Sequence, residues 1–177
     1  KQHLELTRDI AQKFNSDFNC PDFLTTPEPL IQENFSRIMS LKDGTKKMSK
    51  SDPSDQSRIN MTDDKDQIVN KIKKAKTDSA ELPKNDNDIK NRPELLNLYG
   101  IFSSIENQSL KSTINDFKGK NFSDFKNKLA EALVEKIYPI SKEINKLFKD
   151  EKYIDDILEA GSAQAEKIAR KKVNDIK

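Results

Sequence analysis

From residue 62 to the end of the chain, apolar side chains recur at the three- and four-residue spacing of the α-helix. This periodicity is the feature that most restricts the fold, because every regular element that it indicates in this part is a helix. The expected helices cover residues 62–76, 93–105, 110–117, 123–150 and 151–175. The predicted fold class of the chain is therefore mostly α.

Residues that favour helix ends support these boundaries. Thr62 is expected to cap the first of these helices, with Asp63 and Asp64 in its first turn facing the positive end of the helix dipole. Pro93 suits the first position of a helix, and Gly119 suits a position just after one. The lysines in the last turns of the first helix complement its dipole and are expected to be solvated: Lys71, Lys73, Lys74 and Lys76.

The helices at the two ends of the chain have an apolar side. Leu6, Ile10 and Phe14 lie on one side of a helix predicted over residues 2–15. Gly161 is expected to permit a close helix crossing, and Pro139 is expected to kink or divide the 123–150 helix. The residues expected to face inward in the last helix are Ile154, Ile157, Leu158, Ala165, Ile168 and Val173.

The first 61 residues follow a mixed pattern of helix, strand and loop. Pro29 to Ile31 is expected to begin a short extended segment. Ser36 to Leu41 carries enough apolar side chains for a short strand, and Asp43-Gly44 is a strong turn signal. Residues 54–61 are expected to be irregular, and residues 77–93 to form a long surface loop.

Basic and hydroxyl side chains gather in the segment from Thr45 to Ser51, here called the basic segment, which is expected to be a mobile loop. Its members are Lys46, Lys47, Lys50, Ser49 and Ser51, with Met48 as the apolar exception. Ammonium groups and hydroxyls on a loop supply the point charges and donors that bind a polyphosphate. A Walker-type ATPase is not expected, because the chain lacks the G-x-x-x-x-G-K-[ST] pattern.

The composition limits the expected binding partners and the expected cellular compartment. The net charge is only +2, so binding of nucleic acid would require basic residues gathered on one face. Cys20 is the single cysteine, which excludes an internal disulfide framework and favours a reducing, cytoplasmic compartment. No apolar run approaches the length of a membrane span, and no signal peptide is expected.

The run Lys47-Met48-Ser49-Lys50-Ser51 resembles the KMSKS loop of class I aminoacyl-tRNA synthetases. With residues 1–11, 37–41 and 45–53 in this order, the chain resembles the tryptophanyl-tRNA synthetases of bacterial or organellar type. Thr77-Asp78-Ser79 and the residues 95–99 fit the same family, so the resemblance covers essentially the whole chain.

This resemblance implies a fold and a reaction. Residues 1–61 would be the end of a Rossmann-like α/β nucleotide-binding domain, and residues 62–177 an α-helical anticodon-binding domain. The reaction would be ATP-dependent activation of L-tryptophan and its transfer to tRNA(Trp), with Mg²⁺ accompanying the ATP. Lys47 and Lys50 would be catalytic. The residues implied to bind the nucleotide are Ile38, Lys47, Met48, Ser49, Lys50 and Ser51. A homodimer without membrane attachment is expected.

The chain also departs from the family pattern. The family's His-containing phosphate signature and its tryptophan pocket are not in these residues, so a C-terminal fragment that is inactive alone is expected. Gly44 stands where the family would have a proline, and is expected to loosen the chain before the basic segment. The alternatives are a tyrosyl-tRNA synthetase, a non-catalytic helical module that binds tRNA without ATP, and a helical interaction domain whose lysines only face solvent.

Overall fold

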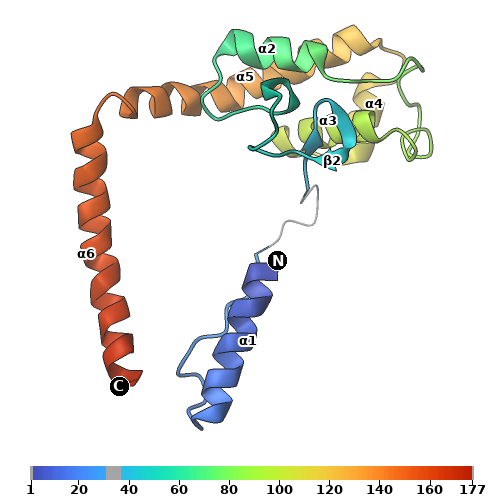
Figure 1. Cartoon of the computed structure of the whole chain (residues 1–177). Coiled ribbons are helices and arrows are strands. Elements are labelled where there is room, and N and C mark those ends of the chain that lie inside the picture. Colours follow the sequence, from blue (N-terminus) through green and yellow to red (C-terminus); the bar gives the residue numbers. More distant parts are fainter. Residues whose placement is uncertain (1, 31–36, 177) are drawn as a thin grey trace. The chain divides into compact units, whose positions relative to one another are not determined.

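The computed structural model describes residues 2–30 and 37–176, and the chain divides into two compact units, Lys1–Ser36 and Arg37–Lys177 (Figure 1). Ile31 and Ser36 lie outside the described residues, and with them the ends of the extended segments expected there. The predicted functional boundary after residue 61 stays a prediction. Each unit is described by itself.

The first unit is built on α1 (Gln2–Asp17), which confirms the predicted helix. Its apolar side is largely uncovered: Leu6 and Ile10 are each 58% exposed, and Ala11 is the buried residue of the helix. Beyond the helix, the chain turns back onto its last turns. Asn15 accepts a hydrogen bond from the Leu24 amide at 2.8 Å and donates one to the Leu24 carbonyl at 2.9 Å.

The second unit begins with a small antiparallel hairpin, β1 (Met39–Ser40) paired with β2 (Asp43–Lys47). The predicted strand is thus shorter than expected, and the predicted turn is wrong, because the turn lies at residues 41–42 and Asp43-Gly44 opens β2. Gly44 is required there for a different reason. A Cβ atom on it would lie 2.4 Å from the Glu94 amide nitrogen, so β2 packs closely against the backbone of the following helical region.

The remaining elements are helices. After the short 3₁₀ helix η1 (Asp55–Ser57), within residues predicted to be irregular, come α2 (Lys65–Lys74), α3 (Pro93–Ile105), α4 (Leu110–Phe117), α5 (Phe122–Leu147) and α6 (Glu151–Ile176). Pro93 opens α3 as predicted, and Gly119 follows α4 with a φ of 78°. α5 continues through Pro139 as one helix.

The predicted cap of α2 is wrong by two residues. Asp64, not Thr62, is the N-cap, and its carboxylate accepts a hydrogen bond from the Gln67 amide at 2.8 Å. The Gln67 side chain accepts one in return from the Asp64 amide, also at 2.8 Å. This reciprocal pair satisfies two backbone donors, which a threonine at residue 62 could not reach.

The core of the second unit lies among α2, α3, α4 and α5, with α2 packed along α5 (Figure 1). Tyr99, Phe117 and Phe125 form its aromatic centre, with Phe125 4.6 Å from Tyr99 and 4.9 Å from Phe117 between ring centroids. Leu41 is only 2% exposed and joins this core. The hairpin is therefore attached to the helices through its turn.

The connection between α2 and α3 has no helix or strand, as predicted for residues 77–93, yet it does not lie only on the surface. Leu82, Pro83 and Ile89 are buried. Arg92 donates to the two carboxylate oxygens of Asp78 at 2.7 and 2.6 Å. The connection is thus held by its own apolar and ionic contacts.

The predicted inward face of α6 is wrong for the structure as described, because no residue of the helix is buried. Leu158 is 63% and Ile168 76% exposed, and a Cβ atom on Gly161 would meet nothing within 4 Å. Periodicity identifies the apolar side of a helix but not whether other atoms cover it. Among the described residues, no helix combines the length and apolar character needed to cross a membrane.

Candidate phosphate-binding segment

The hairpin that carries the basic segment is fixed to its surroundings by backbone hydrogen bonds. Asn97 of α3, 5% exposed, accepts from the Met39 amide at 2.9 Å and donates to the Met39 carbonyl at 2.8 Å. The Leu41 amide donates to the Ser57 carbonyl at 2.9 Å, and the Leu41 carbonyl accepts from the Lys76 amide at 2.8 Å. These contacts tie the hairpin to α3, to η1 and to the end of α2.

The basic segment is only partly the loop that was predicted. Residues 45–47 belong to β2, and the Met48 amide still donates to the Ile38 carbonyl at 3.0 Å. The loop proper then turns tightly. The Ser49 and Ser51 hydroxyls lie 3.0 Å apart, and the Asp52 amide donates to the Ser49 carbonyl at 3.3 Å. The tip therefore presents hydroxyl groups and one lysine on a short, folded stretch of backbone.

The lysines of this region differ in their partners. Lys46 lies 3.6 Å from Asp43, and the Lys42 ammonium donates to the Ser54 hydroxyl at 3.2 Å. Hydrogen bonds from Thr45, together with the charge of Lys46, hold the pKa of Asp43 below its usual value, so this partner stays ionised. Lys47 and Lys50 are exposed, and neither pairs with a carboxylate within residues 2–30 and 37–176.

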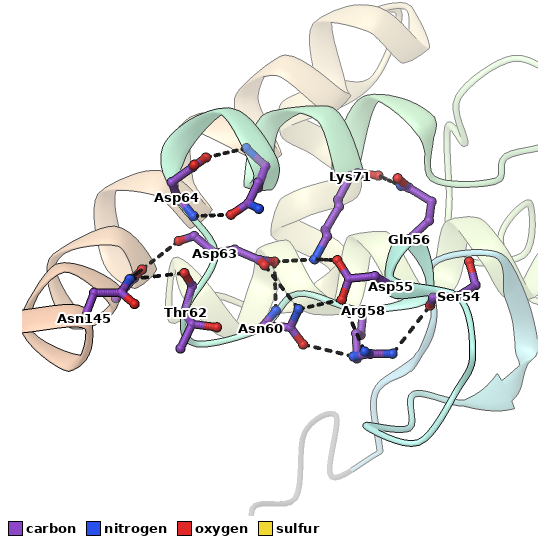
Figure 2. Close-up of polar contacts among 12 residues, drawn as sticks. Ser54, Asp55, Gln56, Arg58, Asn60, Thr62, Asp63, Asp64, Lys71 and Asn145 are labelled. Carbon is purple, nitrogen blue, oxygen red and sulfur yellow. Dashed lines mark hydrogen bonds and ion pairs between the residues drawn. The ribbon is translucent and has the colours of Figure 1, made fainter. Parts of the chain in front are cut away.

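Sequence reasoning missed the polar network beneath the segment, which consists of Asp55, Arg58, Asn60, Asp63 and Lys71 (Figure 2). The guanidinium of Arg58 donates to the Asp52 carbonyl at 2.9 Å and to the Ser54 carbonyl at 3.5 Å. It also donates to Asn60 at 2.9 Å and pairs with Asp55 at 3.2 Å. Arg58 thus joins the end of the loop to η1.

Lys71 is the centre of this network, and the prediction that it is solvated is wrong. Its side chain is 6% exposed, and its ammonium lies 2.6 Å from a carboxylate oxygen of Asp55 and 2.6 Å from one of Asp63. Asp63, whose side chain is 4% exposed, also accepts from the amide and side chain of Asn60 at 2.9 and 3.1 Å. Hydrogen bonds from Lys71 and Asn60 lower the pKa of Asp55.

The network continues into α5. The Ser141 hydroxyl, 1% exposed, donates to the Asp63 carbonyl at 2.7 Å. The Asn145 side chain donates to the Thr62 carbonyl at 3.2 Å (Figure 2). A continuous set of polar contacts therefore runs from the backbone after the basic segment to the second half of α5.

This geometry suits the binding of an anion. A backbone held at both ends presents two ammonium groups without carboxylate partners, together with hydroxyl donors, as a phosphate chain requires. Within the described residues no group of three or more His, Cys, Asp or Glu side chains could hold a metal ion.

An exposed lysine segment on a hairpin, followed by helices, is the arrangement expected for a class I aminoacyl-tRNA synthetase. The family model of class I tRNA synthetases for tryptophan and tyrosine (W and Y) matches residues 1–137, and the chain belongs to this family.

Two of the curated relatives are tryptophan enzymes. The chain is 48% identical over 177 residues to the tryptophan–tRNA ligase of Caulobacter vibrioides, covering 100% of this chain and 52% of that protein. It is 47% identical to the one of Rickettsia conorii, covering 100% of this chain and 53% of that protein. The predicted resemblance to tryptophanyl-tRNA synthetases is confirmed, and the chain spans about half the length of the curated relatives it matches.

Solved structures agree with this assignment. The tryptophanyl-tRNA synthetase of Mycoplasma pneumoniae superposes with a TM-score of 0.78 at 31% identity, covering 98% of this chain and 51% of that one. The enzyme of Campylobacter jejuni, in complex with ADP and tryptophan, gives 0.65 at 25% identity, covering 99% and 52%. The mostly helical fold with its small two-stranded sheet thus resembles about half of a tryptophanyl-tRNA synthetase structure.

Proposed function

We propose that the full-length protein that contains this chain is a tryptophan–tRNA ligase. It activates L-tryptophan with ATP, releasing pyrophosphate, and transfers the tryptophanyl group to tRNA(Trp). The relatives support the substrates, and one observation carries the chemistry: Lys47 and Lys50 are exposed and lack carboxylate partners on a fixed hairpin. Because the chain spans half of its relatives, we expect it to require the other half for tryptophan binding and activity.

Lys47 and Lys50 are proposed to act on the phosphates of ATP. Attack of the tryptophan carboxylate on the α-phosphorus moves negative charge onto the departing pyrophosphate. A cation that meets this charge as it develops stabilises the transition state more than the ground state. Ser49 and Ser51 would donate hydrogen bonds to phosphate oxygens. The chemistry that Mg²⁺ supplies when bound with ATP is neutralisation of phosphate charge.

Ile38 and Met48 are proposed to line the adenine side of the same site. The hydrogen bond between the Met48 amide and the Ile38 carbonyl, 3.0 Å long, places the two residues side by side at the open end of the hairpin. Ile38 is 44% exposed, so apolar surface is available there for a base to cover. The six residues proposed to bind the nucleotide would thus share one end of one hairpin.

The domain assignment is also proposed. Residues 1–61 would complete a Rossmann-like catalytic domain, and residues 62–177 would form the helical anticodon-binding domain. The change from hairpin to an all-helical order after η1 supports this division. The ADP and tryptophan complex of the Campylobacter jejuni enzyme supports binding of a nucleotide and of tryptophan by the full-length protein. A homodimer is proposed for the full-length protein.

Exchange of pyrophosphate into ATP, measured with tryptophan and separately with tyrosine, tests the proposal. We expect exchange with tryptophan by the full-length protein and not by this chain alone. In the full-length protein, Lys50→Ala should lower the kcat of tryptophan-dependent exchange about 10²- to 10³-fold, because one transition-state contact is lost, and tryptophan binding should be unchanged. Lys74→Ala is the matched control, because Lys74 is also exposed but lies on α2.

The alternatives give different results in the same experiment. Exchange with tyrosine instead of tryptophan would identify the other branch of the family. No exchange with either amino acid, combined with tRNA binding that ignores ATP, would favour the non-catalytic helical module. An unchanged exchange rate in Lys50→Ala would remove the catalytic assignment of the lysine and leave the reaction itself in place.

A further inference from the structure

We infer that Arg58 is a positioning residue for the adenylation reaction, which holds the backbone after the basic segment so that Lys50 reaches the phosphates. This inference rests on the proposed function. It starts from the anchors of the loop. On one side the Met48 amide is fixed to the Ile38 carbonyl, and on the other the Asp52 carbonyl is fixed to Arg58. Only residues 49–51 lie between these anchors, and Lys50 is the middle one.

Arg58 is itself held in place. Its side chain is 17% exposed, and its guanidinium contacts Asp55 at 3.2 Å and Asn60 at 2.9 Å. Asp55 and Asn60 are tied to Lys71 and Asp63 in the buried part of the polar network. The guanidinium is thus a rigid fork with donors in both directions, toward the loop carbonyls and toward the network.

Loss of the Arg58 guanidinium lengthens the part of the loop that no contact holds. Apart from the exposed Lys42 contact to the Ser54 hydroxyl, the next contact that would hold it is the ion pair of Asp55 with Lys71 at 2.6 Å. The free stretch would grow from residues 49–51 to residues 49–54. Loop-closure entropy alone then makes the productive position of Lys50 about three-fold rarer. A displacement of the ammonium by about 1 Å would cost up to about 100-fold in rate.

The test compares Arg58→Ala with Arg92→Ala in the full-length protein. Arg92 is a close match, since its side chain is 14% exposed, it pairs with Asp78, and it donates to the carbonyls of Glu81 and Ala80. We expect Arg58→Ala to lower kcat of tryptophan-dependent pyrophosphate exchange between about three- and 100-fold, with the KM for tryptophan unchanged. Arg92→Ala should leave kcat within about two-fold.

The Arg58→Lys variant distinguishes a positioning role of Arg58 from a role in stabilising the fold alone. A single ammonium keeps the charge but cannot bond to Asp52, Asn60 and Asp55 together, so less than half of the loss in kcat should be recovered. If Arg58→Ala does not fold, Arg58→Lys against Arg92→Lys makes the same comparison.

Hydrogen exchange at the backbone amides of Ser51, Asp52 and Ser54 distinguishes failure of the inference from failure of the proposed function, because it does not depend on activity. Faster exchange in Arg58→Ala than in Arg92→Ala supports the role of Arg58 in holding the loop. Equal exchange, or equal kcat losses in the two variants, would overturn the inference. A wild-type protein without tryptophan-dependent exchange would overturn the proposed function, whatever the amide protection of Arg58→Ala.

Discussion

Replacement of Lys71 by methionine, which has a similar volume, tests the energetics of the polar network. The lysine ammonium lies 2.6 Å from both Asp55 and Asp63, and the Asp63 side chain is 4% exposed. Its removal leaves a buried carboxylate without a counter-charge, a change that costs about 3–5 kcal/mol. Because Asn60 still donates twice to Asp63, we expect the lower end of this range, about 3 kcal/mol.

Urea unfolding followed by circular dichroism measures this loss. With a slope of about 2 kcal/mol per molar urea, the midpoint of Lys71→Met should fall by about 1.5 M. Lys74→Met, three residues along the same helix and exposed, should stay within about 0.5 kcal/mol of wild type. Adding Asp63→Asn to Lys71→Met should recover more than about 1 kcal/mol, since no buried charge then remains.

A loss below about 1 kcal/mol in Lys71→Met would refute the reasoning, because it would mean that water reaches Asp63 and screens it. So would a double variant less stable than either single one, since the remaining carboxylate could not then be the origin of the cost. The slope of the transition should be the same in all variants. A changed slope would mean that the extent of unfolding, rather than the ion pair, had been altered.

Two further predictions concern the hairpin and the outer carboxylate of the network. Gly44→Ala places a Cβ atom 2.4–2.7 Å from backbone atoms of Pro93 and Glu94, so urea unfolding should show a loss of about 1–3 kcal/mol in stability. Gly161→Ala in α6, which has open space around it, should instead gain about 0.5–1 kcal/mol. Equal effects of the two substitutions would contradict the packing of Gly44. Because the pKa of Asp55 is lowered in the folded state, its contribution to stability is present above its unfolded pKa of about 3.9 and is lost as pH falls through the lower folded pKa. The difference in Tm between wild type and Asp55→Asn should therefore shrink below about pH 4. A difference in Tm that stays constant with pH would exclude the Lys71 contact.

Local signals in the sequence were sufficient for most of the helical order. Pro93 and Gly119 mark helix boundaries by their own backbone chemistry, so no tertiary contact is needed to interpret them. The same local view placed the turn of the hairpin at Asp43-Gly44, because that dipeptide favours turns wherever it occurs. The glycine serves instead the close approach of β2 to residues 93 and 94, a contact fifty residues away that no local pattern encodes.

The roles of the residues in the polar network likewise depend on contacts that a local sequence pattern does not encode. Asp63 and Asp64 are adjacent and chemically identical, yet one is buried against Lys71 and the other caps α2. Lys71 carries no mark that separates it from Lys74 on the same helix, since its partners are supplied by η1 and by the residue before the cap. The motif residues Lys47 and Lys50 could be found from the sequence, whereas their supporting residues depend on the fold.

The Gly44 contact also corrects the expectation that this residue loosens the chain before the basic segment. A residue whose missing side chain allows backbone atoms to meet at van der Waals distance tightens the hairpin against α3. Asn97 then fixes the opposite strand to the same helix through both of its side-chain groups. Freedom is therefore confined to the few residues beyond Met48.

The distribution of carboxylates explains why the chemistry is proposed for Lys47 and Lys50 rather than for Arg58, Lys71 or Lys76. Arg58, Lys71 and Lys76 each pair with an acidic side chain at 2.6–3.2 Å, and a phosphate could recruit them only by breaking that pair. An exposed lysine without a partner loses only hydration and side-chain freedom when it binds an anion. If Lys47 and Lys50 act on the phosphates as proposed, paired cations hold the backbone and these unpaired ones meet the ligand, so basic side chains serve support and catalysis within one short stretch of chain.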